Sequence, residues 1–358
     1  MEQFKKIVVK LGTNVLTKGN GLLDITNISH LVDQLAELKQ KGIEVILISS
    51  GAVGAGRSMM EVSSDLSKIV RRQVFSAIGQ IKLVNTYSML FANHDIFCAQ
   101  VLATKEDFRD RMHYLNMKNC FLALLRDKVI PIVNENDVVA VSELMFTDND
   151  ELAGLIASMI NADALIILSS VDGVLDGSPD DPNSKVIAEI DPLDKKMMQL
   201  VFPTKSSFGR GGMSTKMRIA RKAAKVGITT FIANGKRANI LLNILNGNYT
   251  GTKFKATNSI SNLKKWIAYN ELEKKGLVQI NKGAAEALCS TSKVSSLLPV
   301  GIIHLEGDFS KGDIVQIINE QKEQLGLGIA QYGIEKAKEW MGLKNKKPLI
   351  HYDYLFIN

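Results

Sequence analysis

Short apolar segments alternate with amphipathic helical segments over roughly the first 250 residues of this 358-residue chain. A helical face is predicted where Ile28, Leu31, Val32, Leu35 and Leu38 recur at three- and four-residue intervals. Further helices are expected at 67–91, 114–126, 151–160 and 213–226, and strands at 6–11, 44–48, 96–102, 129–133, 164–168 and 229–232. This alternation predicts an α/β fold with a mostly parallel sheet covered by helices on both faces. Ligands of such folds bind at the carboxyl ends of the strands.

The pattern changes near residue 260, where the periodicity is lost over 247–262. A helix at 263–275 is expected to lead into short strands at 278–280, 301–305, 314–318, 329–330 and 349–350, which glycines separate. We therefore expect two domains, residues 1–260 and residues 261–358, of which the second is small and β-rich.

Composition excludes several classes of protein. A hydrophobic content of 46% with 23% charged residues is ordinary for a soluble globular chain. Cys98, Cys120 and Cys289 lack metal-binding spacing, and the chain has neither an apolar run of transmembrane length nor a signal-peptide pattern. We expect a cytoplasmic protein that does not contact membranes. The net charge is +7, but residues 262–358 hold 13 Lys, no Arg and 11 acidic residues, so anionic small substrates explain the excess as well as nucleic acid does.

A glycine-rich segment, FGRGGMSTK at 208–216, has the character of a phosphate-binding loop. Gly209, Gly211 and Gly212 permit a tight turn, and Ser214, Thr215 and Lys216 then open a helix whose N-terminus attracts anions. The spacing is not that of a P-loop, and no P-loop match occurs elsewhere in the chain. The alternative is a glycine-rich loop that caps an ordinary helix.

Four more polar segments stand at predicted strand ends or helix starts: 10–13 (KLGT), 49–52 (SSGA), 134–137 (NEND) and 147–150 (TDND). Lys10 ends a hydrophobic strand, so it is either a cation aimed at a phosphate or a lysine whose ammonium reaches solvent. Ser50 and Gly51 offer a hydroxyl and open backbone amides. Asp148 or Asn149 has the alternative role of capping the helix that follows.

Together these segments indicate phosphoryl transfer. In this interpretation Asp137 and Asn149 bind the ammonium or another polar group of a small substrate, and Asp150 orients the lysines by ion pairing. Several acidic groups in one site suit Mg²⁺ or a magnesium nucleotide. Phosphoryl transfer relies on positioning and charge neutralisation, and a carboxylate acceptor needs no general base because its pKa is about 4.3. No convincing Ser/His/Asp or Cys/His arrangement competes with this interpretation.

In this order, VVKLGTNVLT, ILISSGAVGAGR, PIVNENDVV, FTDNDELA and FGRGGMSTK resemble the amino acid kinase family, in particular its glutamate 5-kinase branch. The segments GLVQINKGAAEAL, SLLPVGI and EGDFSKGDIV resemble a PUA domain, which implies a small β-rich barrel. The resemblance implies ATP-dependent phosphorylation of the γ-carboxylate of L-glutamate, the first step of proline biosynthesis, with ATP and Mg²⁺.

The resemblance also implies roles for individual residues. Lys10 and Lys216 would stabilise charge on the transferring group, and Asp150 would hold both. Glutamate would be bound by Ser50, Gly51, Asn134, Asp137 and Asn149, with Asp137 facing the α-ammonium. The nucleotide site would comprise Lys10, Gly12, Ser169, Ser170, Gly209, Arg210, Gly211, Gly212, Met213, Ser214, Thr215 and Lys216. Magnesium would be bound mainly through the phosphates, without a metal site of the protein's own.

Two positions depart from the family pattern. Ser169-Ser170 stand where a Thr-Asp pair is usual, which removes a carboxylate from the nucleotide site, and Arg210 stands where a small residue or Thr is commoner.

Two other functions remain open. One is an acetylglutamate kinase-type enzyme, whose substrate lacks the free ammonium. The other is an RNA-binding or regulatory protein acting through the PUA-like domain, which the absence of arginine there disfavours. The family also implies proline as a feedback inhibitor and a homo-oligomer formed by the kinase domain. The basic amphipathic stretch 109–126 suits either such an interface or packing on the sheet.

Overall fold

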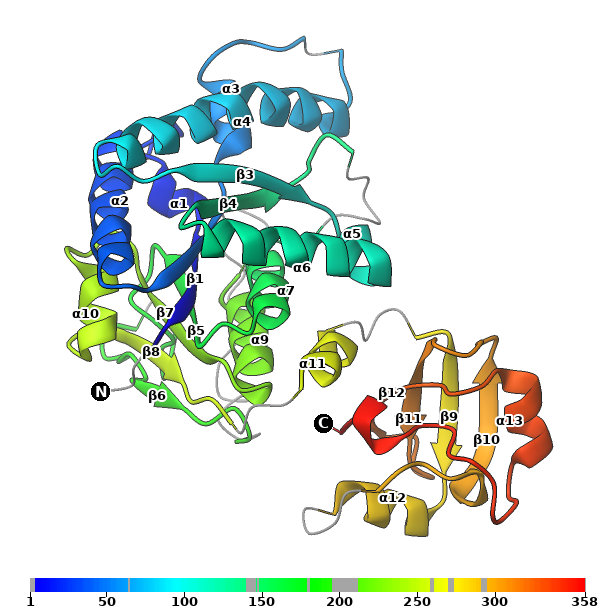
Figure 1. Ribbon diagram of the computed structural model, residues 1–358. Coiled ribbons are helices and arrows are strands. Elements are labelled where there is room, and N and C mark those ends of the chain that lie inside the picture. The colour runs from blue at the N-terminus through cyan, green and yellow to red at the C-terminus, as the bar shows by residue number, and fades with distance from the viewer. Residues whose placement is uncertain are drawn as a thin grey trace. The chain divides into compact units, whose positions relative to one another are not determined.

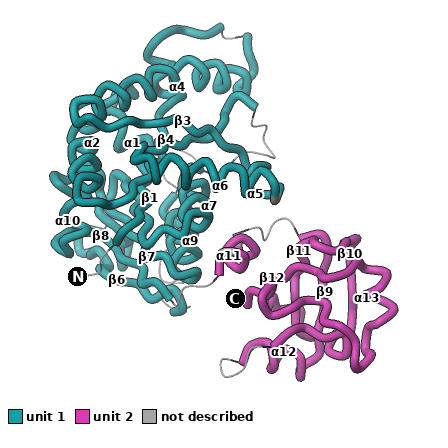
Figure 2. Tube along the Cα trace, viewed as in Figure 1, with its two compact units in different colours: residues 1–259 teal, residues 260–358 magenta. Residues whose placement is uncertain are grey.

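The computed structural model describes residues 4–63, 65–139, 146, 148–178, 181–194, 212–257, 261–269, 274–290 and 295–357. The chain divides into two compact units, Met1–Ser259 and Ile260–Asn358, which Figure 2 shows in different colours. Each unit has its own sheet and its own hydrophobic core. No helix within the described ranges is long and apolar enough to span a membrane.

In the described part of unit 1, eight strands form one sheet in the order β3-β4-β2-β1-β5-β7-β8-β6 (Figure 1). The bounds are β1 (Lys6–Leu11), β2 (Glu44–Ser49), β3 (Cys98–Ala103), β4 (Ile130–Glu135), β5 (Ala164–Ser169), β6 (Glu189–Ile190), β7 (Thr229–Asn234) and β8 (Gly251–Phe254). All neighbouring pairs are parallel except β7 and β8. The predicted mostly parallel sheet is therefore confirmed.

Helices cover both faces of this sheet. The bounds are α1 (Thr13–Leu16), α2 (Ile25–Gln40), α3 (Ala52–Arg57), α4 (Lys68–Ala92), α5 (Lys105–Arg109), α6 (Arg111–Arg126), α7 (Asn149–Ile160), α9 (Met213–Lys225) and α10 (Ile240–Asn246). Helices α2, α4 and α10 lie over one face, and α6, α7 and α9 over the other (Figure 1). The five apolar residues predicted for the α2 face are buried in the core.

The alternation of side chains along β1 explains why a lysine ends a hydrophobic strand. Ile7, Val9 and Leu11 belong to the core beneath α2, α4 and α10. Successive strand residues point to opposite faces, so Lys10 points to the other face, where α7 lies. Lys10 is thus inside the protein rather than at its surface, with 4% of the residue exposed.

Helices α3 and α4 approach each other so closely that only glycine fits between them. A Cβ atom on Gly56 would lie 1.9 Å from the carbonyl oxygen of Phe75, and one on Gly79 would lie 1.8 Å from that of Ala52. The chain enters α3 through Gly51, whose φ of +105° is a left-handed conformation that suits glycine. The strand-to-helix turn at Ser50-Gly51 is therefore fixed against α4.

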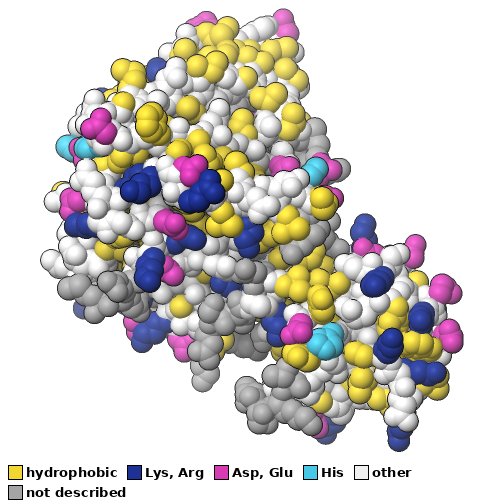
Figure 3. All heavy atoms as spheres, viewed as in Figure 1, with side chains coloured by type: hydrophobic (Ala, Val, Ile, Leu, Met, Phe, Trp, Pro, Cys, Tyr) yellow, Lys and Arg dark blue, Asp and Glu magenta, His cyan; other side chains and the backbone are white. Residues whose placement is uncertain are grey.

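Hydrophobic side chains are visible on the part of unit 1 formed by α3, α4 and β3 (Figure 3). Ile81 and Met89 of α4 are 66% and 73% exposed, and Phe97, just before β3, is 79% exposed. Strand β3 is the edge strand at this end of the sheet. An exposed apolar surface beside a sheet edge is typical of a surface that contacts another protein.

Unit 2 contains a five-stranded sheet in the order β10-β9-β11-β12-β13. The strands are β9 (Gly276–Ile280), β10 (Ile302–Gly307), β11 (Ile314–Ile318), β12 (Gln324–Ile329) and β13 (Leu355–Ile357), and the helices are α11 (Asn262–Tyr269), α12 (Lys282–Cys289) and α13 (Ile334–Trp340), with short 3₁₀ turns η2 (Pro299–Gly301) and η3 (Tyr352–Tyr354). Its core includes Val278, Ile280, Val315 and Ile317.

Two local predictions for unit 2 are wrong. The helix expected to reach residue 275 does not, because the backbone N–H of Lys275 donates to the carbonyl of Ile314 at 2.8 Å, ahead of β9. The strand expected at 349–350 is only an isolated bridge between Leu297 and Ile350. Leu349 and Ile350 are buried, so their apolar character reflects core packing rather than a strand.

Candidate active site

Two lysines and one aspartate from three separate elements meet in unit 1. Lys10 comes from the carboxyl end of β1, Asp150 from the first turn of α7, and Lys216 from the first turn of α9. The Nζ atom of Lys10 lies 2.6 Å from Oδ1 of Asp150, and the Nζ atom of Lys216 lies 3.0 Å from Oδ2. The Asp150 side chain is fully buried. One carboxylate thus fixes two ammonium groups at the same edge of the sheet.

The pKa values of two neighbouring carboxyl groups, Asp148 and Asp150, are shifted in opposite directions. Burial works against the charge on Asp150, but the two lysines hold its pKa below the ordinary value. Burial, followed by the negative charge of Asp150, raises the pKa of Asp148 to about 6. Asp148 is the N-cap of α7, where its Oδ1 accepts from the backbone N–H groups of Asp150 and Glu151. Of the two capping alternatives, Asp148 is the cap.

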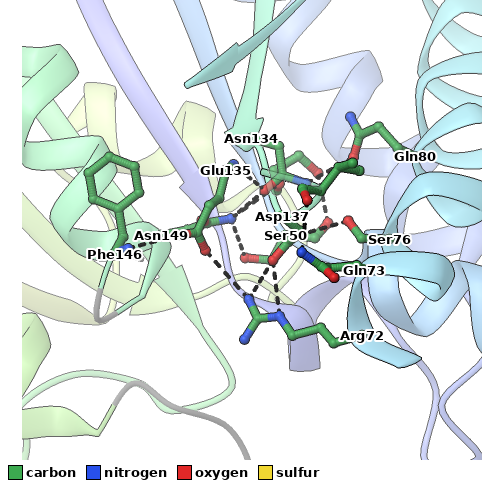
Figure 4. A network of polar contacts seen from close by, with 12 residues as sticks. Ser50, Arg72, Gln73, Ser76, Gln80, Asn134, Glu135, Asp137, Phe146 and Asn149 are labelled. Carbon is green, nitrogen blue, oxygen red and sulfur yellow. Dashed lines mark hydrogen bonds and ion pairs between the residues drawn. The ribbon is translucent and has the colours of Figure 1, made fainter. Parts of the chain in front are cut away.

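Beside this ion-paired group, Asn149 is the centre of a polar network (Figure 4). Its Nδ2 atom donates to Ser50 Oγ at 3.0 Å and to Asn134 Oδ1 at 2.9 Å, and lies 3.3 Å from the carbonyl of Ser49. Asn134 in turn donates to Gln80 Oε1 at 2.9 Å. Asn149 and Asp150 are consecutive residues at the start of α7. The polar network around Asn149 therefore lies directly beside the lysine pair that Asp150 binds.

Asp137 belongs to the same network but contacts a residue that the sequence did not indicate. Arg72 of α4 donates to Asp137 Oδ1 from Nε at 3.0 Å and from Nη2 at 2.6 Å, and Nη2 lies 3.4 Å from Glu135 Oε2. Ser76 Oγ donates to Asp137 Oδ2 at 2.8 Å. Figure 4 shows these side chains converging from α4 and from the end of β4.

Helix α4 thus carries a polar row that was not predicted from the sequence, namely Arg72, Ser76 and Gln80. The available signal was their spacing, because residues four apart share one face of a helix. Ser76 and Gln80, together with Glu135 and Asp137, line a cavity of about 270 Å³. The Nε2 atom of Gln80 is buried and has no hydrogen-bond partner among the described residues. One residue of the cavity lining thus carries a buried, unsatisfied donor.

The residues predicted to bind nucleotide are less clearly assembled. The Gly12 N–H donates to the Leu168 carbonyl at 3.1 Å, so this amide already has a hydrogen-bond partner. Gly12 nevertheless lies close to Lys10, because a Cβ atom at Gly12 would be 3.7 Å from Lys10 Nζ. Ser169 ends β5 and is half-buried, whereas Ser170 is exposed. No described hydrogen bond joins either serine to the lysine pair or to the polar network.

The predicted phosphate loop is only partly described. Gly209, Arg210 and Gly211 lie outside the described residues. Gly212 is the N-cap of α9, and Met213, Ser214 and Thr215 precede Lys216 in its first turn. The N-terminus of α9 thus lies close to Lys216, one of the two lysines paired with Asp150. Within the described ranges, no group of three or more His, Cys, Asp or Glu side chains is placed to hold a metal ion.

Comparison with known proteins assigns this architecture to a class. The amino acid kinase family model matches residues 5–234, and the PUA domain model matches residues 276–351. The solved carbamate kinase from Giardia lamblia bound to AMP-PNP covers 72% of this chain and all of its own, with a TM-score of 0.52 and 21% identity. The UMP kinase from Bacillus anthracis also covers 72% of this chain and 99% of its own, with a TM-score of 0.51 and 14% identity. The chain belongs to the amino acid kinase family.

Curated glutamate 5-kinases are similar to this chain over its full length. The glutamate 5-kinase of Bacteroides thetaiotaomicron is 54% identical over 99% of both chains. That of Chlorobaculum tepidum is 52% identical over 99% of this chain and 98% of its own. The similarity therefore spans both units rather than the kinase part alone.

Proposed function

We propose that this chain is a glutamate 5-kinase, which transfers the γ-phosphoryl group of ATP to the γ-carboxylate of L-glutamate and thereby starts proline biosynthesis. The observation that carries the proposal is the pair Lys10 and Lys216, held by the buried Asp150 next to the hydrogen-bond network of Asn149. Residues 1–260 would form the kinase domain and residues 261–358 the PUA domain, in keeping with the two family matches.

The chemistry needs little beyond alignment and charge stabilisation. The γ-carboxylate of glutamate is ionised at neutral pH, with a pKa near 4.3, and attacks the γ-phosphorus without a base. The bond to the β–γ bridging oxygen breaks, and ADP leaves with that electron pair. Negative charge spreads over the transferring oxygens, so two ammonium groups fixed in advance stabilise the transition state more than the ground state. Asp150 keeps Lys10 and Lys216 in place without reorganisation.

The polar network provides the glutamate site of this proposal. Asp137 faces the α-ammonium, and Ser50, Gly51, Asn134 and Asn149 contact the rest of the molecule. Asn149 holds Ser50 and Asn134 through hydrogen bonds of 3.0 Å and 2.9 Å. Because Asn149 precedes Asp150, the substrate would be bound immediately beside the lysines that serve the phosphoryl group.

The nucleotide site of this proposal comprises Lys10, Gly12, Ser169 and Ser170 together with residues 209–216. The N-terminus of α9 at Gly212 and Met213 suits a phosphate. Magnesium would arrive with ATP and neutralise phosphate charge, held mainly by the phosphates.

Trapping of the acyl phosphate tests the function directly. The full chain is incubated with ATP, Mg²⁺ and hydroxylamine, with L-glutamate and N-acetyl-L-glutamate in parallel reactions. Hydroxamate from L-glutamate alone supports the proposal and the ammonium role of Asp137. Hydroxamate from N-acetyl-L-glutamate alone would show that the substrate is acetylglutamate, and would favour the acetylglutamate kinase alternative within the same fold. A folded chain that is inactive with both would overturn the kinase proposal.

Further properties are proposed from the family. We propose a cytoplasmic homo-oligomer whose contact is the α4–β3 surface, since exposed Ile81 and Met89 lie beside an edge strand. Light scattering of an Ile81→Asp variant tests this, because an unchanged mass would place the contact elsewhere. Proline is proposed as a feedback inhibitor. RNA binding by residues 261–358 is the disfavoured alternative, and salt-independent, negligible association with tRNA would exclude it.

A further inference from the structure

Arg72 is placed where the substrate's amino-acid head would lie. Its guanidinium donates from Nε and Nη2 to Oδ1 of Asp137, a residue that is 6% exposed. The Arg72 side chain is itself 27% exposed, so this arginine is paired with a buried carboxylate while part of its side chain reaches solvent. The residue proposed to bind an ammonium group is therefore already paired with a cation.

The guanidinium retains unused capacity. Its Nη1 atom donates to none of the described residues, and Figure 4 draws one guanidinium nitrogen without a contact. Arginine presents its donors in a planar fork that matches a carboxylate, and such pairs are often bidentate. Arg72 is also the only cation among the labelled residues of Figure 4. A carboxylate bound at this position would accept hydrogen bonds from the Arg72 guanidinium.

The chemistry of an α-amino acid demands such a pair. Its ammonium and carboxylate are attached to the same carbon, so a carboxylate bound beside Asp137 lies next to the group that Asp137 receives. The hydroxyl of Ser76 holds the second oxygen of Asp137 at 2.8 Å. The aspartate is therefore held by α4 from two sides, and its orientation relative to Arg72 is fixed before a ligand arrives.

We propose that Arg72 binds the α-carboxylate of the substrate while Asp137 binds its α-ammonium, which makes the pair a clamp for a zwitterionic amino acid. This inference rests on the proposed function. It extends that function because a residue of α4, Arg72, would make the site selective for substrates that carry both an α-ammonium and an α-carboxylate. The competing explanation is that Arg72 only neutralises Asp137 and is displaced by the substrate's ammonium.

The two explanations predict opposite effects of Arg72→Gln. For the clamp, the KM for L-glutamate rises about 10- to 100-fold, the range expected for losing a hydrogen bond to a charged group. The KM for ATP stays within about twofold, and Arg72→Lys recovers part of the loss because it restores the charge without the fork. For the neutralising role, the KM for L-glutamate is unchanged or falls, because Asp137 is freed for the ammonium.

The measurement is steady-state kinetics on the full chain, with thermal unfolding of each variant recorded first. Arg126→Gln is the matched control, because it removes the same charge from a side chain that is 77% exposed on α6. Competitive inhibition by 4-aminobutanoate, which keeps the amine and the γ-carboxylate but lacks the α-carboxylate, should not weaken in Arg72→Gln. If Arg72→Gln unfolds, Arg72→Lys decides alone through the same KM comparison.

The outcomes separate the inference from the function on which it rests. A wild-type chain that does not phosphorylate L-glutamate overturns the proposed function. An active wild type whose KM for L-glutamate is unchanged or lower in the Arg72 variants overturns the clamp and leaves the kinase assignment intact. A raised KM for L-glutamate in those variants, with unaltered inhibition by 4-aminobutanoate, supports the clamp.

Discussion

Replacing Gly79 by alanine tests whether α3 and α4 touch through their backbones. The added Cβ would lie 1.8 Å from the Ala52 carbonyl oxygen and 2.3 Å from the Gly56 nitrogen, whereas ordinary contact begins at 3.4 Å. Both obstructing atoms are backbone atoms, so no rotation of a side chain relieves the overlap. The two helices must therefore separate by more than about 1 Å, which close-packed interiors resist.

The magnitude follows from two opposing effects. Alanine is favoured over glycine within a helix by about 1 kcal/mol. Overpacking typically costs about 1–3 kcal/mol, and occasionally more. A clash with two fixed backbone atoms belongs at or above the top of that range, so we expect Gly79→Ala to lower the free energy of unfolding by about 2 kcal/mol. For a unit of this size the corresponding fall in Tm is roughly 4–8 °C.

Gly54→Ala is the matched control within α3. Its Cβ would meet the Gly21 carbonyl oxygen at 3.5 Å and Thr17 Cγ2 at 3.8 Å, both ordinary contacts. Only the helix-propensity gain remains there, so this variant should be as stable as the wild type or up to about 1 kcal/mol more stable.

Differential scanning calorimetry and urea unfolding of the full chain measure both glycine variants, with the KM for L-glutamate as a second readout. That KM should rise in Gly79→Ala, since α4 also carries the Ser76 and Arg72 side chains that hold Asp137. If Gly79→Ala unfolds at or above the wild-type temperature, the reasoning from backbone contact is refuted.

Three further predictions concern the charged centre. Asp150→Asn should destabilise unit 1 by about 3–5 kcal/mol, because two buried ammonium groups lose their counter-ion; urea unfolding that matches the wild type would contradict this. Lys216→Ala should lower kcat about 100-fold or more by removing charge stabilisation from the transition state, and near-normal turnover would end the assigned role. Asp148 has its pKa raised to about 6, so the native protein binds this proton more tightly than the unfolded protein does. The contribution of Asp148 to the stability of the wild type is therefore lost as pH rises from about 4 to 6. Asp148→Asn keeps a capping side chain and removes the charge, so at pH 7 it should be more stable than the wild type by about 2–3 kcal/mol. That advantage should vanish below about pH 4, and a difference that is constant with pH would contradict the assignment.

The central strands were predictable because they are buried on both faces and hence read as continuous apolar runs. Strand β1 has the predicted bounds, and β5 and β7 begin at the predicted residues. A lysine inside such a run conflicts with burial unless it is paired, which made Lys10 recognisable as a functional candidate. Short elements such as β6 and β13 had no comparable signal, since two or three residues do not establish a period.

The polar row of α4 could not be assigned from the sequence. Polar residues on an amphipathic helix ordinarily face water, so Arg72 and Ser76 resemble a solvent-facing stripe. Their contact with Asp137 depends on how α4 packs against the end of β4, which lies more than 60 residues along the chain. The same is true of Gly79, whose importance comes from a second helix that no local pattern identifies.

The ion pairs of Asp150 with Lys10 and Lys216 also constrain how the protein folds. Lys10 arrives with the first strand and Lys216 with a helix 66 residues beyond Asp150. An intermediate that buried Asp150 with only one lysine would hold an unbalanced set of charges in a dry interior, so the three segments should dock together. Contacts between segments so far apart in sequence close large loops and form slowly. We expect catalytic activity to be among the last properties to return on refolding, after helix content has recovered, so that turnover reports when unit 1 has folded completely.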